Sequence, residues 1–258
     1  MARVRKKAKF LFYILLFAVI AGVGIWVGKR AKPHFVKYPE FGIELPSNYA
    51  IHGIDVSKYQ QFIDWGLVKE MEVDGVQISF AFIKATEGVR NIDRHFRRNW
   101  KKSRDAGLSR GAYHFFLPGK SGRMQAAHFI SQVELEPGDL PPVIDIEQTF
   151  GVAPVKIRKQ VKEFTDALEH YYKVKPIIYT NISFYNDYLK KEFEDYPLWI
   201  AHYLQKEKPR IEREWLFWQH SETGRVNGIL SLVDFNVFNG DSLQFKTLLI
   251  PEAREVAR

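Results

Sequence analysis

Eight short apolar runs, separated by longer amphipathic stretches, follow one another between residues 51 and 237 of this 258-residue chain. Runs of this length are typical of buried strands, and several of the stretches between them have helical periodicity. The runs are 51–56, 78–83, 111–116, 143–146, 177–179, 198–201, 216–218 and 233–237, and the clearest helices are expected at 95–106, 123–133, 155–172 and 183–190. This alternation predicts an α/β fold, a modified (β/α) barrel of the TIM type. Because the connections after Trp199 are short, the last strands are expected to be joined partly as hairpins.

The run at 143–146 ends in two acids, Asp145 and Glu147, within the segment PPVIDIE at 141–147. Side chains alternate along a strand, so the two acids share a face, with Cα atoms roughly 6.5 Å apart. Two like charges this close cannot both ionise freely, so one carboxyl keeps a raised pKa and can serve as a general acid. Paired carboxylates at about this separation suit cleavage of a glycosidic bond. The same pattern also occurs at the solvated end of an ordinary strand. The residues at the ends of the other strands are therefore needed to distinguish a catalytic pair from a solvated strand end.

Acids also lie near the ends of the first and last runs, at Asp55 and Asp234. In a (β/α) barrel the reactive side chains come from the C-terminal ends of the strands, so these acids are expected in one concavity with Asp145 and Glu147. Aromatic and amide side chains end the neighbouring runs: Tyr113, Tyr179, Trp199, Tyr203 and Gln219. Tyrosine and tryptophan rings stack on the apolar faces of sugars while polar groups bind the hydroxyls. The pattern therefore indicates a carbohydrate site.

Several of these residues have a purely structural alternative. Asp55 could cap a turn, and Lys84 with Glu87 could form an ion pair at the rim, so neither of the latter two is assigned to catalysis. His114, between aromatic residues, is expected to be hydrogen-bonded in the core or rim rather than bound to a metal. The chain has no H-E-x-x-H motif, no phosphate-binding glycine loop and no cysteine, and its G-x-S-x-G match, GLSRG at 107–111, precedes an apolar run instead of following one, so it is not a nucleophile elbow. The sequence therefore indicates no metal, no cofactor, no thiol chemistry and no serine hydrolysis.

The net charge of +8 is concentrated at the N-terminus. Residues 1–37 carry nine basic side chains and no acid, which leaves about −1 for residues 38–258. The folded part is thus nearly neutral, and the sequence pI of about 9.4 gives no argument for a nucleic-acid partner.

Residues 10–28 form a run of 19 uncharged, mostly apolar residues with basic residues on both sides. Such a run can cross a bilayer as a helix. A cleaved secretory signal and a buried helix are the alternatives, but there is no A-x-A cleavage site and the run exceeds the about 7–15 apolar residues of a signal. The denser positive cluster before the run predicts a cytoplasmic N-terminus and an extracytoplasmic C-terminal domain. The predicted organisation is a cytoplasmic tail (1–9), a single transmembrane signal anchor (10–28), a proline-containing tether (29–50), a barrel domain (51–241) and a C-terminal helix or tail (242–258).

With these residues in view, the chain resembles the lysozymes of glycoside hydrolase family 25, the bacterial and phage N-acetylmuramidases. The matching segments are HGIDVSKYQQFIDW (52–65), FAFIKATEG (80–88), GAYHFF (111–116), LPPVIDIE (140–147), PIIYTN (176–181), LWIAHY (198–203), FWQHS (217–221) and VDFNVFNG (233–240). Each motif alone is weak, but eight in family order over nearly the whole segment from 51 to 240 are specific.

The resemblance implies a flattened, modified (β/α) barrel that cuts the β-1,4 bond from N-acetylmuramic acid to N-acetylglucosamine in peptidoglycan glycan strands. It implies that Glu147 is the general acid and that Asp145 is its partner, either as nucleophile or as orienter of the 2-acetamido group. Asp55 and Asp234 would hold substrate and tune the pair, and the sugar contacts would be Tyr113, Tyr179, Trp199, Tyr203 and Gln219. No cofactor is needed. Retention and inversion both stay open, and a route assisted by the substrate's own acetamido group is favoured.

Two other functions fit the same scaffold. A catalytically silent glycan-binding module would be expected to lack one of the four acids, and all four are present. The second alternative is a glycosidase that acts on another N-acetylated polymer such as chitin. The membrane anchor lies outside the resemblance and would hold a wall-cutting enzyme beside its substrate. The sequence indicates no particular oligomeric state.

Overall fold

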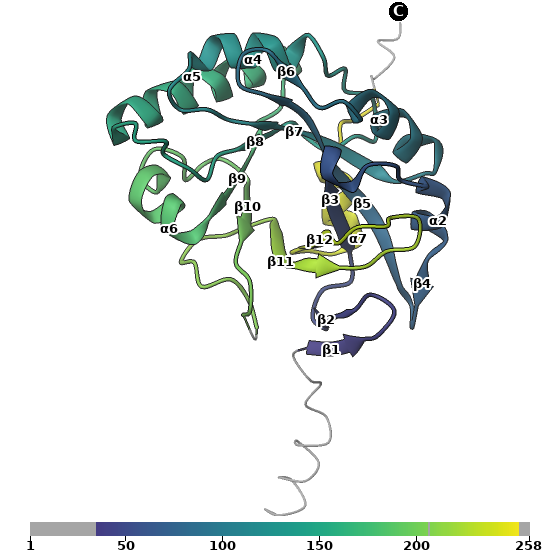
Figure 1. Ribbon diagram of the computed structural model, residues 1–258. Helices are drawn as coiled ribbons and strands as arrows, with labels where there is room; N and C mark the ends of the chain where they lie inside the picture. The colour runs from purple at the N-terminus through teal and green to yellow at the C-terminus, as the bar shows by residue number, and fades with distance from the viewer. Residues whose placement is uncertain (1–34, 206, 253–258) are drawn as a thin grey trace, which may run out of the picture.

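The computed structural model describes residues 35–252 except residue 206, so the predicted span at 10–28 lies outside the described residues. Eight strands of the described part close into a barrel in the order β3-β12-β11-β10-β9-β8-β7-β5, and β5 pairs back to β3 (Figure 1). They are β3 (His52–Val56), β5 (Val76–Glu87), β7 (Ser109–Phe115), β8 (Val143–Asp145), β9 (Ile177–Asn181), β10 (Leu198–Ala201), β11 (Phe217–Gly224) and β12 (Val233–Phe238). The predicted barrel is therefore confirmed. Within the described ranges, no helix combines the length and the apolar character that a membrane crossing requires.

The last strand runs against its neighbours. Each neighbouring pair from β3 through β5 and round to β11 is parallel, whereas β12 is antiparallel to both β11 and β3. The expected hairpin connection at the end of the chain is thus confirmed. One detail of the sequence reading was wrong, because Asp234 lies at the start of its strand and not at the end. The reversal of β12 still brings that start to the rim, where Asp234 is the register partner of Asp55 near the end of β3.

Helices cover the outside of the parallel strands (Figure 1). They are α2 (Trp65–Glu70), α3 (Phe96–Asp105), α4 (Gly122–Ile130) and α5 (Pro154–Tyr172), with shorter pieces η1 (Lys58–Gln60), α6 (Ile182–Phe184), η2 (Tyr185–Leu189) and α7 (Ser242–Leu248), and small strands β4 (Glu72–Val73) and β6 (Asn91–Ile92). The longest, α5, begins with Pro154 in its first turn, where no backbone donor is lost, and ends at Lys173 in the left-handed conformation. The helix expected at 183–190 is divided into the single turn α6 and the π-helical η2.

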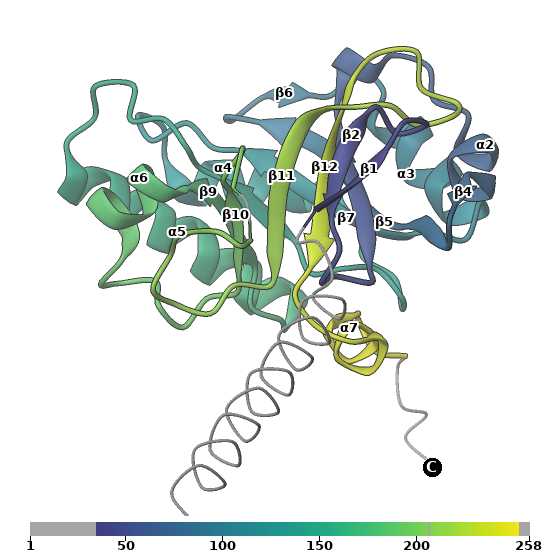
Figure 2. The ribbon, with the colours of Figure 1, turned by 90° about the horizontal axis from the view of Figure 1, so that it is seen from below.

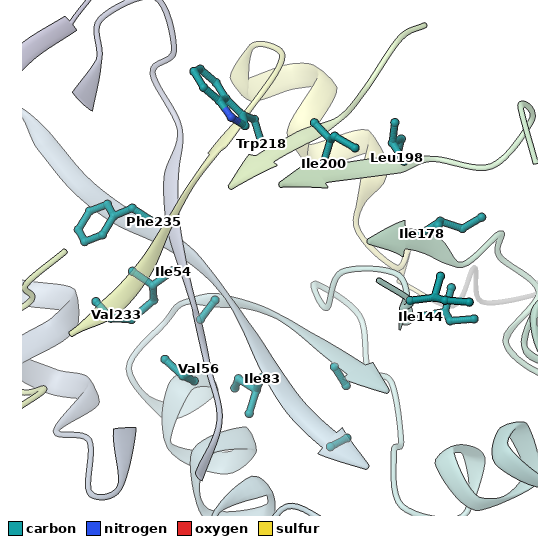
Figure 3. Close-up of a cluster of buried hydrophobic side chains, with 14 of the residues drawn as sticks. Ile54, Val56, Ile83, Ile144, Ile178, Leu198, Ile200, Trp218, Val233 and Phe235 are labelled. Carbon is teal, nitrogen blue, oxygen red and sulfur yellow. The ribbon is translucent and has the colours of Figure 1, made fainter. Parts of the chain in front are cut away.

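Strand alternation divides the core into two layers. Along β5, Phe80 and Phe82 belong to the cluster inside the barrel, whereas Ala81 and Ile83 belong to the cluster between the barrel and its covering. Figure 3 shows part of the outer cluster, including Ile83. The interior is filled by large rings, so the barrel is a packed core that is hollowed only at its rim.

The chain preceding the barrel is folded onto it. β1 (Phe35–Tyr38) and β2 (Ile43–Pro46) form an antiparallel hairpin, seen with β11 and β12 in Figure 2. Phe41 meets Phe235 of β12 at 5.4 Å between ring centroids, and Phe35 meets Trp218 of β11 at 6.2 Å. Phe41 is fully buried. The prediction of a tether over 29–50 is therefore wrong from Phe35 onward, because these apolar side chains cover the outer face of β11 and β12.

Candidate active site

All nine residues that the sequence singled out line one cleft at the rim, with a volume of about 440 Å³. They come from seven strands of the barrel or from the residues directly after them. Five further residues line the same cleft: Ser57, Tyr59, Lys84, Phe115 and Glu222. The alternative of scattered, solvated strand ends is thereby excluded for the nine.

The paired acids lie at the end of β8. Asp145 is the last residue of the strand and is buried, and its Oδ1 atom accepts no hydrogen bond from the described residues. Burial, and then the charge of Glu147, hold the pKa of Asp145 well above its ordinary value. Burial also raises the pKa of Glu147, against the lowering effect of Lys84. The pair therefore keeps a proton to a higher pH than free carboxyls would, as expected from their spacing, but burial is the larger cause.

Asp55 is held by side chains of two other strands. Its Oδ2 atom accepts hydrogen bonds from Gln219 Nε2 and from Asn236 Nδ2, both at 2.8 Å. Burial raises the pKa of Asp55 to about 6, and these two bonds oppose the rise because they stabilise the ionised form. A turn cap would bond to nearby backbone, so that alternative does not apply to Asp55.

The amides that hold Asp55 are fixed in turn by the aromatic residues. Gln219 Oε1 accepts from the hydroxyls of Tyr179 (2.8 Å) and Tyr203 (2.5 Å). Asn236 Oδ1 accepts from Trp199 Nε1 at 2.8 Å. Each amide oxygen is thus engaged, which leaves each amide N–H to face the carboxylate. The predicted sugar contacts consequently also position the acid.

The aromatic residues differ in what they offer a sugar. Trp199 is 2 % exposed and its ring stacks on Phe82 at 4.2 Å between centroids, so it forms part of the floor rather than an open stacking platform. Tyr59, in the turn after β3, is 72 % exposed and lines the same cleft. Tyr59 is therefore the ring with the most free surface for a sugar face, and the sequence reading missed it because it follows the strand end by three residues.

Asp234 completes the cluster of acids. Burial, and after it the charges of Asp55, Glu222 and Glu147, raise its pKa to about 8. Glu222, two residues before the end of β11, was missed because it lies beyond the apolar part of its strand. Asn236 was also missed, although its position two residues after Asp234 puts both side chains on one face of β12.

Lys84 does more than form the ion pair that the sequence suggested, because it also acts on the acids of the cleft. Its Nζ atom lies 2.7 Å from Glu87 Oε2, so the predicted ion pair is present, and 4.6 Å from the ring centroid of Phe115. Lys84 also lines the cleft and faces both Asp145 and Glu147 closely enough to lower the pKa of each. The spacing in FIKATEG indicated the pair but not the direction in which the cation points.

His114 is a core residue, as expected. It is fully buried between Thr86 Oγ1 (2.7 Å) and Gln125 Oε1 (3.2 Å), and burial lowers its pKa to about 3. Among the residues that the structure describes, no group of three or more histidine, cysteine or acidic side chains is arranged to hold a metal ion.

A barrel with clustered carboxylates and ordered aromatic residues at its rim defines a carbohydrate-active class, and comparison with known families agrees. The model of the glycosyl hydrolases family 25 matches residues 54–229, and the chain belongs to this family. The resemblance drawn from the eight motifs is confirmed.

Known relatives cover most of the chain. Lysozyme M1 of Streptomyces globisporus is 34 % identical over 213 residues, which are 77 % of this chain and 71 % of that protein. The uncharacterized protein YegX of Escherichia coli K12 is 45 % identical over 210 residues, 80 % of this chain and 77 % of its own. Among solved structures, a family 25 glycosyl hydrolase from Bacillus anthracis has a TM-score of 0.72 at 32 % identity and covers 85 % of this chain and 99 % of that one. A bacterial lysozyme from Streptomyces coelicolor has a TM-score of 0.70 at 34 % identity, with 77 % and 96 % covered.

Proposed function

We propose that this protein is a peptidoglycan hydrolase, a muramidase that cleaves the β-1,4 bond between N-acetylmuramic acid and N-acetylglucosamine. The observation that carries the proposal is the cluster of Asp55, Asp145, Glu147 and Asp234 in one rim cleft of a family 25 barrel. Lysozymes among the relatives support the substrate class.

Glu147 is the proposed general acid. Its raised pKa keeps the carboxyl protonated at the pH where a free glutamate would be ionised, so it can donate its proton to the glycosidic oxygen as the C1–O bond breaks. Burial raises the pKa of both acids, so the pair holds one proton between them, and in the reacting state that proton lies on Glu147 while Asp145 is its ionised partner. Its unbonded Oδ1 is an acceptor for the N–H of the 2-acetamido group.

The acetamido oxygen then forms a bond to C1 as the leaving sugar departs, giving a cyclic oxazolinium intermediate whose N–H Asp145 stabilises. A water molecule next attacks C1 and passes a proton to Glu147, which restores the acid, while the ring bond to the acetamido oxygen breaks. The hydrogen-bond network of Asp55, Gln219 and Asn236 holds the opposite side of the cleft in place.

The test is digestion of purified peptidoglycan by the full-length protein, with mass spectrometry of the products. The expected result is muropeptides with a reducing N-acetylmuramic acid end and little cleavage of chitooligosaccharides. Faster cleavage of chitooligosaccharides than of peptidoglycan would identify chitin as the substrate instead. Binding to peptidoglycan without any product would establish a silent glycan-binding module instead.

We further propose that residues 10–28 anchor the enzyme in the cell membrane with the barrel on the extracytoplasmic side, where peptidoglycan is found. The apolar run and its basic flanks support this. Because the hairpin begins at Phe35, only residues 29–34 separate such a span from folded structure. At roughly 3.5 Å per extended residue they reach about 20 Å, so the barrel is expected close to the bilayer.

Protease added to intact spheroplasts tests the anchor. The barrel domain should be accessible to digestion, and a short membrane-embedded fragment should remain. Protection of the whole chain, or a mature N-terminus that maps beyond Gly28, would contradict a single uncleaved span.

A further inference from the structure

The chain from Arg90 to Asp105 is strongly basic. These 16 residues hold seven arginines and lysines against two acids, a net charge of +5, whereas residues 38–258 together carry about −1. One of the two acids, Asp93, is buried and accepts backbone hydrogen bonds from Lys58 (2.7 Å) and His95 (2.9 Å). The positive charge is therefore a local concentration that the segment itself does not neutralise.

The basic side chains of this segment fall into two groups. Arg98 donates to the backbone of Ile63 and lies over the Phe62 ring, while Arg104 pairs with Glu136 and Lys102 with Asp105. The other four are exposed, and none forms an ion pair with a described carboxylate. We call these four the basic ridge: Arg90, Arg94, Arg97 and Lys101.

The basic ridge is mounted on a rigid frame. Phe96 and Ser103 of α3 are buried against the barrel, and Asn99 Oδ1 accepts from Trp65 Nε1 at 3.3 Å. A fixed helix presents its charges at less entropic cost than a loose segment would. Charges on such a frame favour recognition of an extended partner.

The ridge begins at the rim. Arg90 and Arg94 flank β6, whose residues pair with Thr86 and Glu87 at the end of β5, next to the cleft. The other two residues, Arg97 and Lys101, belong to α3, which lies on the outside of the barrel beside β5 (Figure 1). A polymer that leaves the cleft on this side would therefore reach Arg90 and Arg94 first.

The cleft and the ridge have opposite charge. Within the described part of the chain, five carboxylates line the cleft against one cation, Lys84. An anionic substituent is repelled from such a cleft and attracted to a basic surface beside it. The substrate of the proposed function has this division of charge, because its N-acetylated glycan is uncharged while the attached peptides carry free carboxylates.

We propose that the basic ridge binds the carboxylates of the peptides attached to peptidoglycan, so that the enzyme selects peptide-bearing strands over uncharged glycan. This rests on the proposed muramidase function and adds a second contact surface to it. The ridge acts on binding and not on bond cleavage, so its loss raises KM and leaves kcat unchanged.

The experiment uses the full-length protein and its double variant Arg94→Glu/Lys101→Glu. The matched control is Lys156→Glu/Lys159→Glu, which makes the same charge change at exposed positions of α5. The substrates are solubilised peptidoglycan strands and the same strands with peptide carboxylates capped as neutral ethanolamides. Initial rates of reducing-end release are measured at 20 mM and 500 mM NaCl.

For the wild type and the control, cleavage of uncapped strands should slow with salt, because the Debye length shrinks from about 20 Å to about 4 Å. The ridge variant should show a KM about five- to tenfold higher on uncapped strands at low salt, an unchanged kcat and equal rates on capped strands. Equal loss on both substrates, no loss on either, or the same loss in the control would overturn the proposal. A wild type that cleaves neither substrate would instead refute the muramidase function itself.

Discussion

The two ends of the barrel interior have opposite chemistry. At the rim, five carboxylates share one cleft, and burial raises the pKa of four of them. At the other end, which α7 closes opposite β6 in Figure 2, Phe245 packs on Phe80 at 5.7 Å and on Phe238 at 5.2 Å between ring centroids. The aromatic rings at the α7 end exclude water. The rim instead gathers carboxyl groups whose ionised form would be more stable in water than in the protein.

The contrast shows where stability and activity lie. A carboxyl whose pKa rises on folding makes the folded state less stable once it ionises, so the rim lowers stability at neutral pH. Ring burial contributes of the order of 2–3 kcal/mol for each large side chain, so the closed end offsets that cost. Variants at the closed end should therefore change stability alone, and variants at the rim should change activity with little loss of stability.

The largest effect is expected at the closed end. Phe245→Ala removes a ring that is 7 % exposed, and the free energy of unfolding should fall by about 3 kcal/mol. Urea denaturation measures this loss, and peptidoglycan hydrolysis at 25 °C should proceed at the wild-type rate per folded molecule. Leu243→Ala, at a position 71 % exposed on the same helix, is the control and should change stability by less than about 0.5 kcal/mol. A folded Phe245→Ala protein with impaired hydrolysis would show that the two ends are not independent.

The next effect is expected at the proposed acid. Glu147→Gln keeps the size of the side chain but cannot donate the proton, so turnover should fall at least about a hundredfold with the fold retained. Hydrolysis rates and thermal unfolding measure the two properties together, and Glu194→Gln on the surface is the control. A Glu147→Gln protein with more than a tenth of wild-type turnover would remove Glu147 from this role. Among the other acids, Asp145→Asn should be the most damaging, because Asp145 ends β8 only two residues before Glu147, and burial and then the charge of Glu147 raise its pKa.

A smaller effect concerns stability and pH. The pKa of Asp234 is about 8 in the folded protein against an ordinary 3.8, so the folded state prefers its protonated form. Well below pH 3.8 the group is protonated in folded and unfolded chains alike, and stability is then lost progressively as the pH rises from there to about 8, because only the unfolded chain ionises freely. Asp234→Asn removes this loss. Its melting temperature should be nearest to that of the wild type at pH 3 and should exceed it at pH 8.5 by at least about 2–4 °C, which corresponds to at least about 1 kcal/mol. Asp187→Asn, on the surface of η2, should show no such trend, and neither should Asp234→Asn if Asp234 is ionised throughout.

Local sequence was sufficient for the barrel and for much of the site. Each of the eight strands has an apolar run of its own. Because the functional side chains of a barrel lie at the ends of its strands, nine residues of the cleft could be predicted from the sequence alone. The direction in which a strand runs could not be predicted in this way, because it depends on the connecting segment and not on the residues of the strand. For that reason Asp234 was placed at the wrong end of β12.

The hairpin β1–β2 was missed for a related reason. Its two strands are short, Pro39 and Pro46 interrupt the segment, and no periodicity marks it as a strand pair. What stabilises it is contact with Trp218 and Phe235, about 180 residues further along the chain, and a local reading has no access to such contacts. The orientation of Lys84 was hidden in the same way, since β7 supplies the Phe115 ring over which its cation lies.

The smallest effect should be a displaced pH profile on replacing Lys84. Among the described residues that line the cleft, Lys84 is the one cation, and it lowers the pKa of Glu147 and of Asp145, although burial keeps both raised. Lys84→Met removes that influence while keeping an unbranched side chain over Phe115. Both carboxyls then hold their protons to higher pH, so both limbs of the rate profile should move to higher pH, by about half a unit to one unit.

The ion pair with Glu87 provides the comparison for this last prediction. Glu87→Gln leaves the cation in the cleft and removes only the group to which its Nζ atom is bonded at 2.7 Å. If the charge of Lys84 sets the profile, Glu87→Gln should shift it little, whereas Lys84→Met should shift it fully with a similar melting temperature. Equal shifts in the two variants would instead mean that the pair acts by holding the rim together. An unshifted Lys84→Met profile would show that the charge of Lys84 does not reach the acids, and burial together with repulsion between the acids would then raise their pKa values unopposed.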